Sequence, residues 1–367
     1  MTGVSVLSLR ELNRATLERQ MLLRRQQLSA LQAIEHLVGM QAQAPAPPYV
    51  GLWTRLKGFH PGELSQLILD RRAVRVALMR NTVHLVSARD CLALRPLVQP
   101  VIDRGLYANR SGIPGVDIEA LSAAGRTLLE EKPRTAKELG VLLQEQWPEH
   151  DPASLARAIR HHLPLVQVPP RGVWRKSGPA AHTTVETWLG RPLDRDPSLE
   201  EMVLRYLGAF GPATVKDVQT WSGLTRLGGV VDRLRPHLRT FRGEHGKELF
   251  DLPDAPRPDP ETPAPLRFLP EFDNLLLSHA DRTRVIAEEY RKAIASRNGM
   301  VPATFLIAGF VRGTWKTART RQKATLVIEP FEPLARKDRD ALAEEGERLI
   351  RFTSENAGAF EVRLDEP

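Results

Sequence analysis

Apolar residues recur every three or four positions in several stretches of the chain, and this spacing predicts amphipathic helices. Leu31, Ile34 and Leu37 share one face of a helix that should end at Gly39. Ser29 and Gln32 have the spacing of a capping box at its start. Two further helices are expected at 7–20 and 62–70, followed by a hairpin of strands 74–80 and 82–88.

An internal repeat organises the next part of the chain. Residues 132–178 and 211–254 open with similar helix starts, "TAKE" and "TVKD", and an amphipathic helix precedes each. Each then shows a turn, an arginine-rich helix and two short strands around a glycine turn. Helix, helix, helix and hairpin in that order are typical of a winged helix. The first hundred residues follow the same order, so we predict three winged helices in tandem.

A proline-rich run at 252–265 marks a linker, and strands, a helix and a final strand follow it. The fold class predicted is therefore α+β, with a C-terminal β-hairpin or sheet and a helix after the winged units. The expected boundaries are 1–115, 116–195 and 196–255 for the three winged units and 256–367 for the C-terminal part.

Composition narrows the choice of partners. There are 52 Lys and Arg against 44 Asp and Glu, a net charge of +8, with a pI of about 9.9. That excess favours a polyanion. The longest apolar run, 305–311, is too short to span a bilayer, and the N-terminus has no signal-peptide pattern. Cys91 is the only cysteine in the sequence, which excludes an intramolecular disulfide and a zinc site built from several cysteines. We expect a cytoplasmic, nucleoid-associated monomer without metal or cofactor.

The basic residues gather in three runs, 152–179, 224–243 and 310–327, each with five cations and at most one acid. These runs fall on expected recognition helices, wings and strands, which favours a phosphate-tracking surface over solvated arginines. The residues expected to contact DNA are Arg80, His84, Arg157, Arg160, Arg175, Lys176, Arg226, Arg233, Arg242 and Lys316. For His84 a structural role competes with this one. The adjacent His161 and His162 lack the spacing of metal ligands.

Gln41 and Gln43 raise a separate question, because glutamine has no useful pKa. Ala44 precedes Pro45, which disfavours the helical conformation, so residues 40–48 should run extended. The two side chains would then project from the same side and could hold one water or one sugar oxygen between them. Alternatively, they cap the preceding helix or bond a neighbouring loop.

The ordered set of motifs in this chain resembles the AlkZ-like winged-helix DNA glycosylases. It comprises Gln41-Ala42-Gln43, "GLWTRL" at 51–56, "RNTVHLVSARD" at 80–90, "FLPEFDNLLLSHADRTR" at 268–284 and "FLIAGFVRGTWK" at 305–316. The resemblance implies a concave basic DNA cradle, catalysis by Gln41 and Gln43, and a β-hairpin that enters the duplex.

The hairpin expected to probe the lesion turns at Ala308 and Gly309 and carries Phe310 and Arg312; alternatively, these strands are simply buried in the core. Asp273 and Asn274 are interpreted mainly as a polar scaffold under the cradle, with direct DNA contact as the alternative.

The chemistry explains why two amides would suffice. A guanine alkylated at N7 is cationic and leaves readily, so the enzyme needs only to hold a water and steady the charge that develops on the sugar. Gln-Φ-Gln is the pattern of the antibiotic-resistance branch of the family. It favours bulky N7-guanine adducts and N7–N7 interstrand crosslinks in duplex DNA, excised by a monofunctional glycosylase without lyase activity. The competing hypothesis is a non-enzymatic winged-helix transcriptional regulator.

Overall fold

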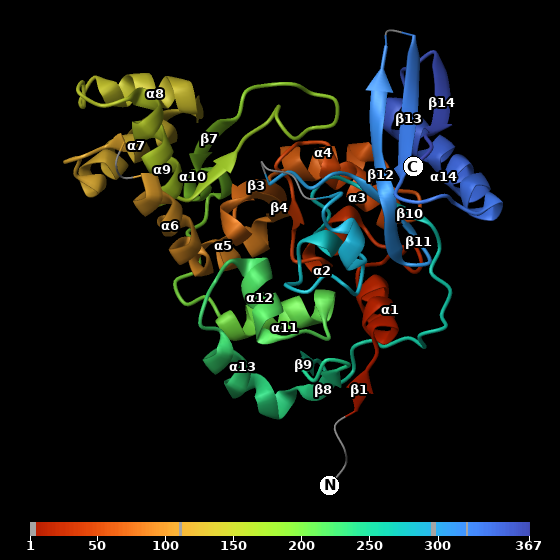
Figure 1. Cartoon of the computed structure of the whole chain (residues 1–367). Coiled ribbons are helices and arrows are strands. Elements are labelled where there is room, and N and C mark those ends of the chain that lie inside the picture. Colours follow the sequence, from red (N-terminus) through yellow and green to blue (C-terminus); the bar gives the residue numbers. More distant parts are fainter. Residues whose placement is uncertain (1–4, 110–111, 295–298, 321) are drawn as a thin grey trace.

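The computed structural model describes residues 5–109, 112–294, 299–320 and 322–367, and its fold is α+β (Figure 1). Helix α1 follows a short strand, and the first repeat comes after it. These elements are β1 (Val6–Leu7), α1 (Leu9–Arg19), α2 (Ala30–His36), β2 (Met40–Gln41), α3 (Pro47–Arg55), α4 (Pro61–Leu69), β3 (Ala73–Ala77) and β4 (Val83–Ser87). A 3₁₀ turn, η1 (Met79–Asn81), joins β3 to β4.

Two further segments repeat the order of three helices and a hairpin, and the first of them also has a short strand after its first helix. The second comprises α7 (Ile118–Glu131), β5 (Arg134–Thr135), α8 (Ala136–Gln144), α9 (Pro152–His162), β6 (Leu165–Gln167) and β7 (Ala181–Thr184). The third comprises α11 (Leu199–Phe210), α12 (Val215–Ser222), α13 (Gly228–Leu234), β8 (Arg239–Gly243) and β9 (Glu248–Asp251). Helices α5 (Ala88–Leu97), α6 (Gln99–Asn109) and α10 (Val185–Leu189) connect the repeats.

Strand pairing is equivalent in the first two repeats and is reduced to a single bridge in the third. The first strand pairs antiparallel with the last, as β2 with β4 and β5 with β7. In the third repeat a single bridge between Ala213 and Phe250 takes this place. Capping boxes at Thr135 and Thr214 start the equivalent helices α8 and α12, as their shared sequence pattern predicts.

The hairpins of the first two repeats are not separate. They form one six-stranded sheet in the order β2-β4-β3-β6-β7-β5, in which β3 and β6 pair antiparallel. The third hairpin instead pairs with β1 at the start of the chain. The first two repeats therefore share backbone hydrogen bonds, whereas the third is joined to them through side chains.

The C-terminal part is a five-stranded sheet with one helix beside it. Its elements are β10 (Arg267–Leu269), β11 (Thr304–Ile307), β12 (Phe310–Arg319), β13 (Lys323–Pro330), α14 (Arg336–Ser354) and β14 (Ala359–Leu364). The hairpin of β12 and β13 projects beyond the rest of the sheet, on the side of the molecule opposite α7–α9 (Figure 1). In the described part of the chain, no helix is long and apolar enough to cross a membrane.

The expectation that residues 40–48 run extended is wrong beyond Gln41. Only Met40–Gln41 form a strand, and α3 already begins at Pro47. Helix α3 begins this early because Pro47 and Pro48 occupy its first positions. The backbone N–H that proline lacks would have no partner within the helix at these positions.

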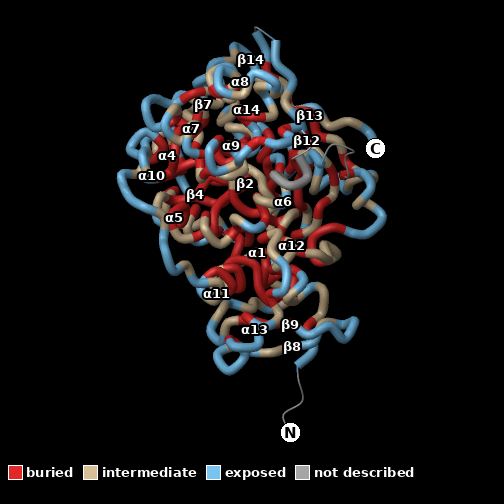
Figure 2. Tube along the Cα trace, turned by 90° about the vertical axis from the view of Figure 1, so that its left-hand side faces the viewer, coloured by how far each residue is buried: buried red, intermediate tan, exposed pale blue. Residues whose placement is uncertain are grey.

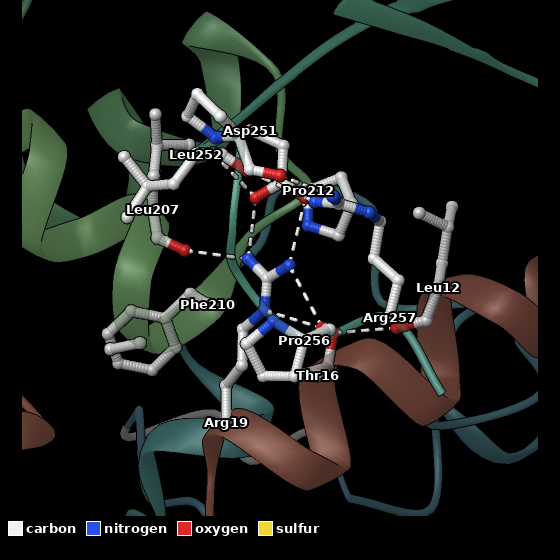
Figure 3. Close-up of polar contacts among 12 residues, drawn as sticks. Leu12, Thr16, Arg19, Leu207, Phe210, Pro212, Asp251, Leu252, Pro256 and Arg257 are labelled. Carbon is white, nitrogen blue, oxygen red and sulfur yellow. Dashed lines mark hydrogen bonds and ion pairs between the residues drawn. The ribbon is translucent and has the colours of Figure 1, made fainter. Parts of the chain in front are cut away.

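Buried residues concentrate in the middle of the molecule, around α1, β4 and α11 (Figure 2). Arg19 of α1 lies inside this core, and its guanidinium makes a bidentate pair with Asp251 at 2.6 and 2.9 Å. It also donates to the carbonyl oxygens of Leu207 and Pro256, while Arg257 approaches the same carboxylate (Figure 3). One arginine thus ties the first helix to α11, β9 and the proline-rich linker.

We predict that Arg19→Leu lowers the free energy of unfolding by ~3 kcal/mol, because it leaves a buried carboxylate with only Arg257 for charge compensation. Urea unfolding followed by circular dichroism measures the change. The matched control is Arg10→Leu on the same helix, whose pair with Glu261 is exposed, and it should change stability by less than ~1 kcal/mol. Equal losses in both variants would contradict the role given to Arg19.

Candidate functional site

Gln41 lies at the end of β2, on the edge of the six-stranded sheet, opposite His84. Its side chain is 6% exposed. The amide oxygen Oε1 accepts a hydrogen bond of 2.8 Å from Nη2 of Arg80. The other terminal nitrogen of Arg80 donates to the carbonyl oxygen of Trp221 in α12. Arg80 therefore links the amide of Gln41 to the third repeat.

Gln43 is exposed, just beyond the strand. Its Oε1 accepts from the backbone N–H of Val83 at 3.2 Å, and the N–H of Ala42 donates to the carbonyl of Val83 at 2.7 Å. Both partners of the glutamine oxygens are donors only, so they fix which end of each amide is the oxygen. Each oxygen keeps a second lone pair. The alternative that the glutamines bond a neighbouring segment is confirmed for one lone pair of each amide oxygen.

Both amides are therefore held by the same short segment, the 79–83 turn (Met79–Val83). Arg80 and Asn81 each have a φ of 57°, a left-handed conformation that reverses the chain within the turn. Helix α12 ends against this turn at Gly223, where an added Cβ would lie 3.2 Å from the backbone of Arg80. The close approach of α12 therefore depends on glycine at this position.

The charges around the turn are set by burial. Desolvation lowers the pKa of Arg80 to about 10, with a further contribution from Arg282, so the guanidinium is still protonated at neutral pH. Burial and then the charge of Arg80 lower the pKa of His84 to about 3. His84 is 1% exposed, and its Nδ1 lies 2.9 Å from the carbonyl oxygen of Thr82. His84 thus lies inside the protein as a neutral ring, which corrects its expected surface position and favours the structural alternative.

Two clefts flank the loop that carries Gln43. The first, which we call the Arg75 cleft, has a volume of about 270 Å³, and Gln43 lines it. Its other polar lining residues are Arg75, Asn81, Arg157, Arg160, His161, Gln167 and His182. The second, the Arg175 cleft, has a volume of about 290 Å³, and residues 44–46 line it together with Arg175, Lys176 and Arg319. The Gln43 loop thus separates two basic clefts.

Gln41 lines neither cleft. It borders a small void of about 10 Å³ next to Arg55 and Asp273, whose bidentate pair measures 2.8 Å for both bonds. Asn274 donates to the carbonyl oxygen of Gly39 at 2.7 Å. The interpretation of Asp273 and Asn274 as a polar scaffold is confirmed by these buried contacts.

The structure divides the cations expected at DNA into two groups. Arg157, Arg160, Arg175 and Lys176 line the clefts beside the Gln43 loop. The others line neither of the two clefts: they are Arg80, whose guanidinium is bound to Gln41 and Trp221, Arg226, Arg233 and Arg242 in the third repeat, and Lys316 on β12. Arg233 pairs with Glu200 and Lys316 with Glu329, both at 2.5 Å. Their roles in DNA binding stay predictions.

The hairpin expected to probe the lesion does turn at Ala308 and Gly309, but its tip is not free. Asn13 of α1 donates to the carbonyl of Gly309 at 2.8 Å, and Arg14 donates to that of Ala308 at 3.2 Å. Phe310 is half-buried, and Arg312 pairs with Glu332. The expected free wedge is therefore corrected: this tip is docked on the first helix.

Sequence reasoning missed three features of the site: the grip of the 79–83 turn on both amides, helix α3, and the buried Arg75. The Pro47–Pro48 pair was a signal for α3, because proline is favoured at the first helical position. Among the described residues, no group of three His, Cys, Asp or Glu side chains could hold a metal ion.

Comparison with known proteins identifies the class first. The profile of a family described as DNA glycosylase AlkZ-like matches residues 34–352, which assigns the chain to the DNA glycosylases rather than to the transcriptional regulators. The chain belongs to the AlkZ-like family. It is 23% identical over 361 residues to the interstrand DNA cross-link repair glycosylase of Streptomyces sahachiroi, covering 91% of this chain and 94% of that protein. The solved structure of the Streptomyces sahachiroi DNA glycosylase AlkZ has the same fold, with a TM-score of 0.78 at 20% identity over 98% of this chain and 100% of that one.

We predict that Arg80→Gln slows base excision about tenfold, the effect of losing one charge-assisted hydrogen bond worth ~1.5 kcal/mol. Arg80→Lys should be impaired too, because one ammonium cannot replace the guanidinium that reaches Gln41 and Trp221 together. Single-turnover excision at saturating enzyme measures the effect separately from binding. A normal rate in both variants would show that Arg80 does not position Gln41.

Proposed function

We propose that this protein hydrolyses the N-glycosidic bond of cationic N7-alkylated guanine in duplex DNA, with a water held by Gln41 and Gln43. The observation that carries the proposal is the grip of the 79–83 turn on both amide oxygens. That grip leaves one lone pair on each oxygen, and Gln43 lines a cleft that cations surround. It supports a positioned pair of acceptors that needs no titrating base.

The reaction we propose follows from the leaving group. The bond between C1′ and N9 breaks first, and its electron pair neutralises the alkylated guanine, which departs as an uncharged base. Water adds to the cationic sugar, and the proton that it carried passes to solvent. The amide oxygens orient that water and place the negative ends of two dipoles near the developing charge. We infer a monofunctional enzyme without lyase activity, because water is the nucleophile.

We further propose that each repeat is a winged helix and that the three units lie along one duplex as a monomer. The equivalent pairings of β2 with β4, β5 with β7 and Ala213 with Phe250 support equivalent units. The arginines and lysine of the two basic clefts would then face the strand that carries the lesion.

Bulky adducts and N7–N7 interstrand crosslinks are the substrates that we propose for this site. The name of the Streptomyces sahachiroi relative, a cross-link repair glycosylase, supports this choice. So does the Arg75 cleft, whose lining residues include no carboxylate in the described part of the chain. A tethered base cannot leave the duplex fully, so a site between open clefts suits it better than an enclosed pocket.

The direct test is incubation with duplex DNA that contains one N7-methylguanine, followed by mild base to cleave at abasic sites. Wild-type protein should generate strand breaks at that position. Gln41→Ala and Gln43→Ala should each reduce the single-turnover rate by ~10²-fold or more, the scale for a positioned electrostatic group. Binding to duplex should change little. Near-normal excision by the double variant would remove the glutamines from the mechanism.

The pH dependence gives an independent prediction. His84 stays neutral above about pH 3, and Arg80 stays charged below about pH 10, so neither changes state in the working range. The single-turnover rate should therefore be flat between about pH 5 and about pH 9. A rate that falls tenfold per pH unit on the acid side would indicate a titrating general base instead.

A further inference from the structure

The Arg75 cleft lies between the two repeats that share the six-stranded sheet. Strand β3 and the 79–83 turn supply one wall, and α9, β6 and β7 supply the other. Gln43 lies at its edge. Its volume of about 270 Å³ is slightly below the ~300 Å³ at which small-ligand sites begin, so it fits a phosphate group with part of a sugar rather than a base pair.

Arg75 is the deepest cation in this cleft. It is 2% exposed, and its Nε donates to Oε1 of Gln167 at 3.2 Å. Its Nη2 has no hydrogen-bond partner among the described residues. Burial, and then the nearby Arg171, lower its pKa to about 10, which leaves it protonated at neutral pH.

Arg75 differs in this respect from two other buried arginines, Arg19 and Arg55. Arg19 and Arg55 are equally buried, but each makes a bidentate pair with an aspartate. No ion pair between Arg75 and a carboxylate occurs in the described part of the chain. A buried, protonated guanidinium without a counter-ion is costly, so an anion that enters the cleft would be stabilised strongly.

The neighbours of Arg75 determine which anion fits. Arg157 and Arg160 of α9 line the same cleft, so three permanent cations face it. His182 also lines it, with a pKa lowered to about 4 by burial and by Arg160, so its ring adds no charge at neutral pH. The positive electrostatic field of the three arginines would repel a cationic N7-alkylguanine and attract a phosphodiester.

We propose that the Arg75 cleft binds one backbone phosphate of the lesion strand, with Arg75 as its innermost ligand and Arg160 at its mouth. The alkylated base stays outside the cleft. A phosphate fixed there would place the adjoining sugar against Gln43, which is the part of the substrate that the water must reach. This inference rests on the proposed function, because it specifies how the DNA strand is held beside the glutamines.

Single methylphosphonate linkages test the proposal, because each removes the charge of one phosphate. The substrate is a duplex with one N7-methylguanine and one neutral linkage placed in turn at each position around it. Wild-type protein should lose about tenfold in single-turnover rate at one linkage near the lesion, the effect of losing one charge-assisted contact. Arg75→Gln and Arg160→Gln should be slower on normal DNA and insensitive to that same linkage. Arg75→Lys should recover part of the sensitivity.

The matched control is Arg226→Gln, which removes one exposed cation outside the cleft and should keep the full sensitivity at that linkage. Arg160 is exposed, so its variant decides the question even where Arg75→Gln does not fold. Equal sensitivity of wild type, Arg75→Gln and Arg160→Gln at every linkage would overturn the inference, as would a wild type that is indifferent to all of them.

A second readout separates this inference from the proposed function. The affinity for the same set of duplexes is measured by fluorescence anisotropy, which requires no excision. If wild type releases no base, the proposed function fails, and the binding data still decide the inference. One neutral linkage should then weaken binding by wild type and by Arg226→Gln but not by Arg160→Gln. If no linkage gives this pattern of binding, the inference about the Arg75 cleft is overturned.

Discussion

Buried pairs between arginine and a carboxylate are the constraint on which the arrangement of this protein depends. Arg19 with Asp251 joins the first helix to the third repeat, and Arg55 with Asp273 joins α3 to the C-terminal part. Two further pairs connect α5 with α11 and the segment before α2 with α14; they are Asp90 with Arg205 and Arg25 with Glu345. Each pair bridges elements far apart in sequence, and loss of one partner leaves a charge in a dry environment. Such pairs specify one geometry of docking, whereas apolar contacts alone would tolerate several.

That geometry reaches the candidate site directly. Gln41 borders the void next to the Arg55–Asp273 pair, and its amide is held by Arg80, which is itself anchored on α12. The position of the amide therefore depends on how three parts of the chain pack together: the first repeat, the third repeat and the C-terminal sheet. A glutamine that acts through orientation rather than through its pKa needs such support, because its amide dipole is useful only when it points in a fixed direction.

Local sequence patterns predicted much of the fold. The helix after Ser29, the capping boxes of α8 and α12, the hairpin around Arg80–Asn81 and the C-terminal strands all follow from periodicity and turn chemistry. The shared sheet of the first two repeats did not, because the pairing of β3 with β6 joins segments about ninety residues apart. The docking of the Ala308–Gly309 tip depends on Asn13 and Arg14, nearly three hundred residues away.

The sequence singled out the two glutamines of the candidate site but not the contacts that hold them. Gln41 and Gln43 stand out because they follow a helix and precede prolines. Their hydrogen-bond partners could not be inferred from the sequence. Val83 contributes only a backbone N–H, which every residue except proline has, and the side chain of Arg80 was interpreted as a phosphate contact. Arg75 was missed for a related reason: in "AVRVA" it alternates with valines as a solvent-facing cation would, and only the packing of the second repeat over β3 buries it.

The pairing of β3 with β6 also limits how the width of the Arg75 cleft can change, because paired strands can shift only by whole residues. Arg75 lies opposite Gln167 in the register, and both residues line the cleft. A slip by one residue would turn every side chain of the strand to the other face. The two walls of the cleft are therefore held together at this pair of residues by the strand register. In the proposed complex the two walls would hold the DNA strand at one spacing, and the third repeat, whose hairpin pairs with β1 and not with the shared sheet, lies outside that constraint.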